Sequence, residues 1–353
     1  MAPWKYLLLP LAGLYNMITR IRNHLYDIGH KKSFQFDTVV ISVGNLNVGG
    51  SGKTPMIEYL IHLLSPHYKL AILSRGYGRK TIGFRMATPH DSAGTLGDEP
   101  FQIYRKFGKE VVVAVGEERA LAIPTILHEH PEVQLILLDD AFQHRAVVPQ
   151  ISILVTDYSK PFFQDFVLPF GRLREARVGA ARADVVVVTK CPGLTESVEQ
   201  SIKSKVATFV GSKPIFFMQQ GYRDPEPIGH TAAISNTVIL VSGIANSSSL
   251  EQHLASRFKV IKHFRFADHH HYTHHDLEVI TKFARDHEGT SLVTTEKDMV
   301  KLIEEPLRNL LEPNRWFYIP LHTHFVKDGS EFDAFITTQV ESARKAVTWG
   351  THE

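Results

Sequence analysis

The chain of 353 residues has an ordinary globular composition and almost no net charge. Hydrophobic residues make up 43% and charged residues 22%, which excludes a disordered chain, a collagen-like fibre and a multi-span membrane protein. The formal charge of +2 is too small to indicate nucleic-acid binding. The lone Cys191 excludes an internal disulfide framework and a cysteine-rich zinc site, and it is typical of a reducing compartment. At roughly 150 residues per domain, the length predicts about two domains.

The N-terminal segment 3–29 is the first uneven stretch. Its apolar part, from Tyr6 to Ile18, is interrupted by Pro10 and Asn16. It is too short for a spanning helix, which needs about 20 apolar residues, and it lacks the basic start and cleavage site of a secretory signal. Apolar residues then recur at helical spacing, with basic residues among and after them: Leu14, Ile18, Ile21, Leu25 and Ile28, with Arg20, Arg22, Lys31 and Lys32. This pattern predicts either a helix in the membrane interface or an amphipathic helix docked on the protein's own core.

From Asp37 onward, short β-rich runs alternate with helical patterns. Continuous apolar runs separated by helices predict a parallel sheet covered on both faces. The expected strands are Thr38–Val43, Leu70–Leu73, Val111–Val115, Val133–Leu138, Ile151–Val155 and Val185–Val188. A stretch at 216–230 that is rich in glycine, proline and charge predicts a domain boundary. A second α/β set follows, with strands Val238–Val241, Val260–Phe264, Leu292–Thr295 and Trp316–Pro320, a helix around Leu277–Phe283 and a final helix over 331–346.

The strongest chemical signal is the segment GNLNVGGSGKT at 44–54. It follows a predicted strand and opens a predicted helix, which is the context that a phosphate-binding P-loop requires. We expect the loop to surround nucleotide phosphates with Asn47, Val48, Gly49, Gly50, Ser51, Gly52, Lys53 and Thr54. Lys53 would reach the β- and γ-phosphates, and the Thr54 hydroxyl would bind Mg²⁺.

One position departs from the strict P-loop pattern, which has glycine where this chain has Asn47. Asparagine tolerates positive φ, so we expect the turn to form nevertheless. The alternative is a glycine-rich turn that binds nothing.

A P-loop also needs a carboxylate for its metal ion, usually at the end of a neighbouring strand. The run Val133–Leu138 ends in Asp139-Asp140, so we expect Asp139 to bind the metal; the alternative is a pair of solvated acids. Two regulatory classes are disfavoured. Residues 189–192 read TKCP instead of the guanine-binding N-K-x-D, and Val48 occupies the place of the signature lysine of partitioning ATPases. An ATP-dependent enzyme is therefore expected ahead of a switch.

Further segments occur in order along the whole chain: SRGYGRK (74–80), GDEP (97–100), DDAFQHR (139–145), LPFGRLRE (168–175), ADHHHYT (267–273) and TTEKDMVKL (294–302). Together with LLLPLAGLYN and GNLNVGGSGKTP, they make the chain closely resemble the tetraacyldisaccharide 4′-kinases, the lipid A 4′-kinases of Gram-negative bacteria. The resemblance implies transfer of the γ-phosphoryl group of ATP to the 4′-hydroxyl of a tetraacylated glucosamine disaccharide 1-phosphate. It also implies a requirement for Mg²⁺, lipid IV-A as the product, and work at the cytoplasmic face of the inner membrane.

The same resemblance implies a P-loop α/β/α sandwich domain and a second, smaller α/β/α domain, joined by a two-stranded linker, with an N-terminal amphipathic helix. We accordingly expect a membrane-associating helix (1–35), a kinase domain (36–212), a linker (213–235), a smaller domain (236–312), and a return strand with a final helix packed on the first domain (313–353). KPIFFMQQG and RWFYIPLHT would be the linker strands. Because the acceptor carries acyl chains, the interfacial interpretation of the first helix is favoured. Neither nucleic acid nor an obligate protein partner is expected.

By resemblance, Asp98 is the catalytic base and works with His269. The alternative for Asp98, placed in a loop, is a helix N-cap before Pro100. Because the two residues lie in different predicted domains, closure on ligand binding is expected. The histidine run 268–275 has pairs at zinc-binding spacing, His270–His274 and His271–His275, but Thr273 and Asp276 predict a capping box there instead.

The resemblance also assigns Arg174 to phosphate, Glu175 to the metal and Gln143 to the metal's surroundings, with a surface ion pair as the alternative for the first two. The chain departs from the family pattern at Arg172 and Ala176, and Arg172 is a candidate contact for a nucleotide or lipid phosphate. The family's D-D-G-F-Q-H carries Ala141 here, which predicts a backbone without positive φ at that position.

Two further segments keep open alternatives. Arg75 and Arg79 either contact the acceptor 1-phosphate or ATP, or belong to a solvated basic loop. Residues 296–298 either face the cleft or form a local cap and ion pair. For the whole chain, the alternatives to the lipid A kinase are a kinase for another amphiphilic sugar and a membrane-associated ATPase switch.

Overall fold

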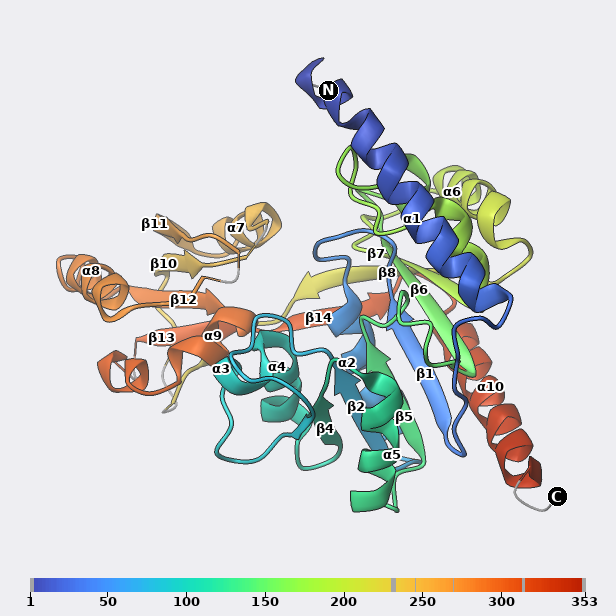
Figure 1. The fold of residues 1–353 in the computed structure, drawn as a ribbon. Coiled ribbons are helices and arrows are strands. Elements are labelled where there is room, and N and C mark those ends of the chain that lie inside the picture. The colour runs from blue at the N-terminus through green and yellow to red at the C-terminus, as the bar shows by residue number, and fades with distance from the viewer. Residues whose placement is uncertain (1–2, 230–232, 245, 269, 313–314, 351–353) are drawn as a thin grey trace.

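The computed structural model describes residues 3–229, 233–244, 246–268, 270–312 and 315–350. Two α/β bodies of unequal size lie side by side and are joined by strands β8 (Ile215–Tyr222) and β14 (Leu321–Phe325), which run between them in Figure 1. The fold class expected from the sequence is therefore confirmed.

The larger body is built on a sheet that has nine strands in the described part of the chain, in the order β14-β8-β7-β6-β1-β5-β2-β4-β3. Its inner strands are parallel, whereas β3 and β14 pair antiparallel at the two edges. The remaining strands are β1 (Val39–Gly44), β2 (Leu70–Ser74), β3 (Arg85–Met86), β4 (Val112–Val115), β5 (Leu135–Asp139), β6 (Ile151–Asp157) and β7 (Val185–Thr189).

Helices cover both faces of this sheet because alternate strand residues point in opposite directions. Val39 and Ile41 of β1 pack in the cluster that contains α2 (Lys53–Leu64), α4 (Asp98–Phe107) and α10 (Gly329–Gly350), whereas Val40 packs in the cluster of α5 (Arg119–Glu129). Helix α6 (Glu196–Val210) covers a third cluster. Shorter elements are α3 (Ala93–Leu96), η2 (Phe162–Gln164) and η3 (Arg177–Arg182). The carboxyl ends of β1 and β5 thus meet at one edge, where the P-loop and Asp139 lie.

The smaller body repeats the design with five strands in its described residues, in the order β11-β10-β12-β13-β9. Helix α8 (His274–Arg285) packs on one face and α7 (Ser248–Ala255) on the other. Helix α9 (Glu296–Leu302) follows β12 directly. The strands are β9 (Glu226–Pro227), β10 (Thr237–Ser242), β11 (Lys259–Arg265), β12 (Ser291–Thr295) and β13 (Trp316–Ile319), and η4 (Leu307–Leu310) precedes the last.

The linker differs in one respect from the expectation. The segment RWFYIPLHT is not one strand, because Trp316–Ile319 belongs to the smaller sheet as β13 and only the residues after Pro320 form β14. Strand β14 pairs with β8 from Leu321 opposite Tyr222 to Phe325 opposite Met218. Helix α10 then packs beside β1 in the larger body. The domain boundaries given above remain a prediction.

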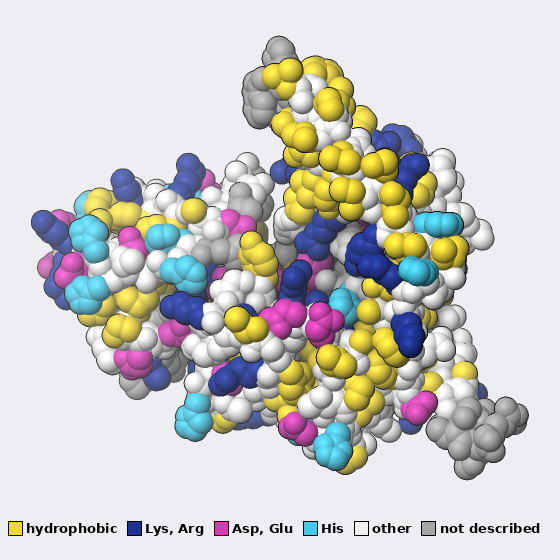
Figure 2. Space-filling view, viewed as in Figure 1, with side chains coloured by type: hydrophobic (Ala, Val, Ile, Leu, Met, Phe, Trp, Pro, Cys, Tyr) yellow, Lys and Arg dark blue, Asp and Glu magenta, His cyan; other side chains and the backbone are white. Residues whose placement is uncertain are grey.

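The N-terminal helix α1 (Leu9–Asp27), preceded by η1 (Pro3–Leu8), leaves its apolar face in solvent. Five large apolar side chains are between 51% and 55% exposed: Leu11, Leu14, Met17, Ile18 and Ile21. Among the residues of α1 only Ala12 is buried. Figure 2 shows these side chains as an apolar band with basic side chains beside it. The alternative of an apolar face docked on the core is therefore wrong. Within the described residues, no helix is both long and apolar enough to cross a membrane.

Candidate active site

The P-loop connects β1 to α2 and gets its shape from two glycines with positive φ. Gly49 has φ 104°, and Gly52, with φ 87°, is the residue before the first turn of α2. The turn forms as expected, but Asn47 does not adopt the positive φ that asparagine would have tolerated there. Its side-chain amide instead donates to Asp165 Oδ2 at 3.0 Å. The asparagine that replaces the usual glycine therefore attaches the P-loop to the loop that contains Asp165.

The P-loop lies against two other loops. A Cβ on Gly44 would come within 2.6 Å of Phe142 Cβ, so glycine is required where β1 meets the DDAFQHR loop. On the other side the backbone N–H of Val48 donates to Arg172 O at 2.8 Å, and the N–H of Arg174 donates to Leu46 O at 2.7 Å. The prediction for Ala141 is confirmed, because the positive φ of 49° lies one residue earlier, at Asp140.

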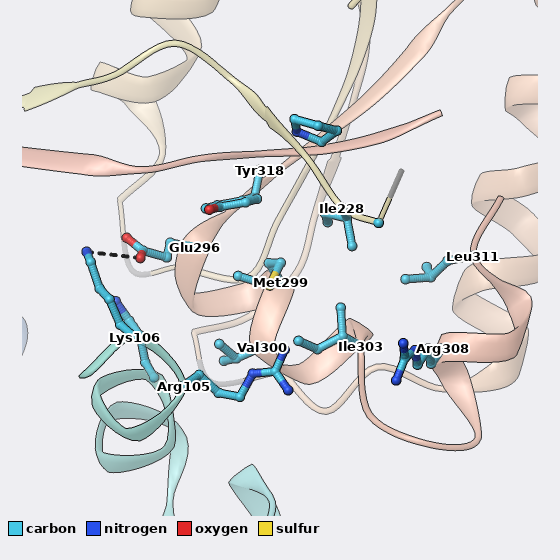
Figure 3. Close-up of a pocket in the computed structure, with 13 residues that line it drawn as sticks. Arg105, Lys106, Ile228, Glu296, Met299, Val300, Ile303, Arg308, Leu311 and Tyr318 are labelled. Carbon is cyan, nitrogen blue, oxygen red and sulfur yellow. Dashed lines mark ion pairs between the residues drawn. The ribbon is translucent and has the colours of Figure 1, made fainter. Parts of the chain in front are cut away.

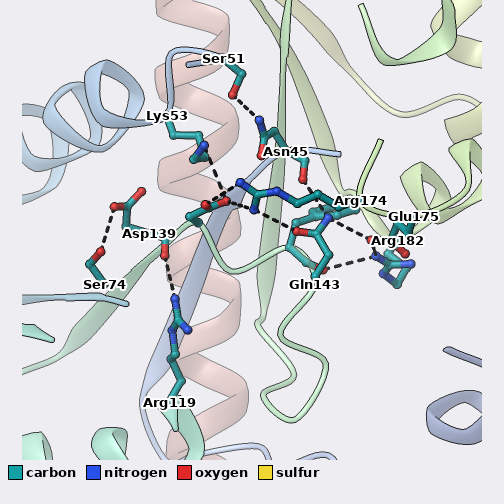
Figure 4. A network of polar contacts seen from close by, with 12 residues as sticks. Asn45, Ser51, Lys53, Ser74, Arg119, Asp139, Gln143, Arg174, Glu175 and Arg182 are labelled. Atoms are coloured by element: carbon teal, nitrogen blue, oxygen red, sulfur yellow. Dashed lines mark hydrogen bonds and ion pairs between the residues drawn. The ribbon is translucent and has the colours of Figure 1, made fainter. Parts of the chain in front are cut away.

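Two cations, Lys53 and Arg174, converge on Asp140, and Figure 4 shows these two cations beside the end of β5. Lys53 Nζ lies 3.6 Å from Asp140 Oδ1. The guanidinium of Arg174 donates to both carboxylate oxygens of Asp140, at 2.8 and 3.0 Å. Burial acts to raise the pKa of Asp140, but the charges of Lys53 and Arg174 outweigh it and hold that pKa below its usual value. Asp140 therefore positions both phosphate-binding candidates, Lys53 and Arg174, a role that was not predicted from the sequence.

Asp139 lies at the end of β5 and is 1% exposed. Its Oδ2 accepts from the Ser74 hydroxyl at 3.2 Å, whereas Oδ1 has no partner among the described residues. Burial raises the pKa of Asp139 to about 7, and the charges of Glu99 and Asp140 act in the same direction. A buried carboxyl with a free oxygen fits a metal ion. No group of three His, Cys, Asp or Glu side chains is arranged as a metal site in the described residues. Mg²⁺ at this site would therefore also need hydroxyl, water and phosphate oxygens as ligands, which is how proteins usually bind this ion.

Glu175 and Gln143 are already bonded to each other and to neighbours. Glu175 is 3% exposed and accepts from Asn23 at 2.7 Å, from Arg182 at 2.7 Å and from Gln143 at 3.1 Å. The Gln143 amide also donates to Asn45 O at 2.9 Å. A metal ion would have to compete with these donors, so direct metal binding by either residue stays a prediction. The observed contacts are those of side chains that brace the loops around the P-loop.

The polar side of α1 contributes to the same network, which the sequence analysis missed. The Tyr15 hydroxyl donates to Arg174 O at 2.8 Å, and Arg22 donates to Gln143 O at 2.8 Å. With the bond from Asn23 to Glu175, three side chains of the helix hold the loops that carry the candidate residues.

Asp98 is the first residue of α4, not a loop residue as expected. Gly97 is the N-cap, and the helix has no side-chain capping bond, so the capping role suggested as the alternative is not observed. Asp98 is 8% exposed, and its Oδ2 lies 2.9 Å from Lys301 Nζ of the smaller body. The expected partner, His269, lies outside the described residues.

The histidine run supports the capping prediction. Thr273 and Asp276 form the expected capping box at the start of α8. His270 Nε2 lies 3.0 Å from Asp276, while His274 is mostly exposed and faces Glu278. Among the described residues these histidines form no metal cluster.

The remaining basic candidates divide into paired and exposed groups. Arg79 NH2 donates to Glu117 at 2.5 Å and to Gly83 O at 2.6 Å, and Arg172 Nε donates to Asp165 at 3.0 Å. Arg75 is exposed, so its expected contact with phosphate stays a prediction. Burial, followed by the charges of Arg119, Arg22 and Arg75, lowers the pKa of His144 to about 4.

The TTEKD segment forms the expected local cap, but the ion pair of Glu296 is with the larger body and is not local. The Thr295 hydroxyl caps α9 by accepting from the Asp298 N–H at 3.0 Å, and Glu296 lies 3.1 Å from Lys106. A pocket of about 590 Å³ opens beside this contact, between α4 and α9, and Figure 3 shows Lys106, Glu296 and Met299 among its lining. Glu296 is the candidate residue that lines it, whereas the described residues predicted to hold phosphate, metal or the acceptor proton lie elsewhere.

Comparisons with known proteins agree over almost the whole chain. The LpxK model, described as tetraacyldisaccharide-1-P 4′-kinase, matches residues 4–341. A tetraacyldisaccharide 4′-kinase of Flavobacterium johnsoniae is 43% identical over 341 residues, which cover 95% of this chain and 97% of the relative. The corresponding protein of Cytophaga hutchinsonii is 39% identical over 340 residues, which cover 95% of this chain and 96% of the relative.

A solved structure matches as well. LpxK from Aquifex aeolicus, determined in complex with ATP, gives a TM-score of 0.73 at 28% sequence identity, with 95% of this chain and 99% of that chain covered. The chain therefore belongs to the tetraacyldisaccharide-1-P 4′-kinase family.

Proposed function

We propose that this chain transfers the γ-phosphoryl group of ATP to the 4′-hydroxyl of a tetraacyldisaccharide 1-phosphate and so forms lipid IV-A. The observation that carries the proposal is the P-loop with Lys53 beside the Asp139-Asp140 edge, in a chain that matches the LpxK family from end to end. Phosphoryl transfer needs positioned charges more than covalent chemistry, and this edge supplies them.

Residues 47–54 hold the phosphates of ATP, with backbone N–H groups of the loop and the start of α2 turned toward them. Lys53 and Arg174, which pair with Asp140 in this structure, are the two cations that turn to phosphate oxygens when ATP arrives. The planar guanidinium of Arg174 suits two oxygens at once. Asp140 thus keeps both cations in place before binding.

Asp139 and the Thr54 hydroxyl would hold Mg²⁺. Glu175 and Gln143 would either be further ligands or support the loops around the metal ion. The Oδ1 of Asp139, which has no partner in the part of the chain that the structure describes, supports this assignment, because a bound cation offsets the cost of a buried charge. When bound, Mg²⁺ neutralises charge that develops on the transferred phosphoryl group.

Asp98 accepts the proton of the 4′-hydroxyl, together with His269. A general base raises the rate by about 10²–10⁴-fold when its pKa is near the working pH and it lies within hydrogen-bond reach of the proton that it accepts. The position of Asp98 at the first turn of α4, close to the smaller body, supports a site that is completed by both bodies.

Helix α1 lies in the cytoplasmic face of the inner membrane, where the acyl chains of the acceptor are found. Its exposed apolar band enters the acyl boundary, while Arg20, Lys31 and Lys32 face the headgroups. The lipid acceptor and the membrane surface are the partners that this arrangement needs.

The test is transfer of labelled γ-phosphate from ATP to tetraacyldisaccharide 1-phosphate in detergent micelles, by the wild type, Lys53→Ala and Asp98→Asn. We expect labelled lipid from the wild type and a loss of at least about 100-fold in each variant. Wild-type label that appears only on a different glycolipid would give a kinase for another amphiphilic sugar. No labelled lipid, with ATP hydrolysis intact, would give the membrane-associated switch.

A further inference from the structure

Lys301 is a buried cation that the smaller body presents to the larger one. It is 5% exposed and lies on α9, where Nζ is 2.9 Å from Asp98 Oδ2 and donates to the backbone oxygen of His270 at 3.2 Å. One ammonium group therefore joins the first turn of α4 to the loop that contains the histidine run.

Helix α9 is held firmly on both sides, so the position of Lys301 is fixed. Leu302 is buried in the core of the smaller body, whereas Val300 packs with Leu96 and Phe101 of the larger one. Asp298 ties the helix to the residue that follows β10, by accepting from the N–H of Gly243 at 2.8 Å. The lysine therefore reaches Asp98 only when the two bodies are docked.

A base must be ionised to accept a proton, and a cation at this distance favours the ionised carboxylate. Other charged groups around Asp98 act in the opposite direction. Glu99 is its neighbour in α4, and Glu304, just after α9, accepts from the N–H of Ala93. Burial raises the pKa of Glu304. The hydrogen bond from the Ala93 N–H and the charge of His271 oppose this rise, whereas the negative charge of Asp98 adds to it.

We propose that Lys301 is a positioning residue for the transfer reaction: it keeps Asp98 ionised and oriented, and it makes the active base conditional on docking of the smaller body. The proposal rests on the proposed function, because it gives Asp98 the role of base. It also explains why a lysine is buried at a contact between bodies, where an apolar side chain would pack as well.

The test is the pH profile of kcat/KM for the lipid acceptor, measured with wild type, Lys301→Gln and Lys301→Arg. Glutamine keeps a hydrogen-bond donor but removes the positive charge that favours ionised Asp98. The acidic limb of the kcat/KM profile should therefore move to higher pH by about one to three units. Activity should recover as the pH rises, and arginine should restore the wild-type limb. Melting temperatures of all variants show that they are folded.

Lys106→Met is the matched control. Lys106 lies on the same helix as Asp98 and bridges to Glu296 of α9 at 3.1 Å, so its loss weakens the same contact between the bodies without touching Asp98. We expect its acidic limb to coincide with that of the wild type. If the limb of folded Lys301→Gln also coincides with the wild type, Lys301 is only a structural ion pair and the proposal is overturned. A wild type that forms no labelled lipid would instead overturn the proposed function.

Discussion

The two long helices at the ends of the chain use their apolar faces in opposite ways. Helix α10, with 22 residues, buries Phe332, Ile336 and Val340 completely against the central sheet. Helix α1, with 19 residues, leaves a band of similar side chains about half exposed. Both lie on the larger body in Figure 1, one along the sheet and one projecting beyond it.

The difference lies in how each helix is attached. Helix α10 is held by apolar burial, whereas α1 is held through Tyr15, Arg22 and Asn23, which bond to the loops of the candidate site. A helix fixed by its polar side has its apolar side free for another environment. Amphipathic spacing by itself therefore does not tell which face is inside, and the following predictions test the contrast.

The largest expected effect is on folding, and it should be confined to α10. Phe332→Ala should lower the free energy of unfolding by about 3–5 kcal/mol, because it leaves a cavity in the core. Ile18→Ala in α1 should change it by less than about 0.5 kcal/mol, since that side chain is already exposed. Urea unfolding measures both values. Equal losses would mean that α1 is packed as α10 is.

The next effect is on membrane binding, and it should be confined to α1. Replacing Leu14, Ile18 and Ile21 together by serine should weaken binding to phosphatidylglycerol vesicles by about 100-fold, because each side chain buried in the acyl boundary contributes roughly 1 kcal/mol or more. Co-sedimentation measures the binding. The control replaces Val198 and Val279, exposed apolar residues of α6 and α8, by serine. A comparable loss in the control would show that general hydrophobicity is responsible.

A smaller effect is expected on the polar side of α1. Asn23→Ala removes a donor from the buried carboxylate of Glu175, which should cost about 1–3 kcal/mol of stability or a matching loss in kcat. His24→Ala, on the exposed neighbouring position, is the control. Denaturation and steady-state kinetics give the two quantities. If both variants behave like the wild type, α1 does not brace the site.

The smallest effect concerns Asp139, at the site that α1 braces. Its folded pKa of about 7 exceeds its ordinary value of 3.8, so the folded chain keeps a proton that the unfolded chain has lost between those values. Stability should therefore fall as pH rises through this window, by about 1 kcal/mol between pH 6 and 7. Asp139→Asn should lack this slope and be inactive. Urea unfolding without nucleotide tests it; equal slopes would contradict the assignment.

Much of the fold follows from the sequence because buried parallel strands are continuous apolar runs. The expected strands from Thr38–Val43 to Trp316–Pro320 lie within about two residues of those observed. The P-loop can also be predicted from the sequence, because a strand, a glycine-rich segment and a helix follow one another directly. The linker was divided wrongly, since a run such as RWFYIPLHT carries no mark of the point where one sheet ends and another begins.

The site was less predictable because its network is made by contacts between distant segments. Nothing local marks Asp140 as the partner of both Lys53 and Arg174, and the polar side of α1 reads as surface. Lys301 belongs to a segment for which the sequence left a cleft-facing position and a local cap with an ion pair equally open, yet it reaches a carboxylate about two hundred residues away. Buried charges of this kind become visible only once the packing is known.

The most direct test of the account compares phosphate transfer to tetraacyldisaccharide 1-phosphate held in phosphatidylglycerol vesicles with transfer in detergent micelles, by wild type and the Leu14, Ile18 and Ile21 serine variant. We predict that the variant loses at least about tenfold of its activity on vesicles and keeps wild-type activity in micelles. Equal activity of the two proteins on vesicles would contradict the claim that α1 joins the membrane to a kinase site.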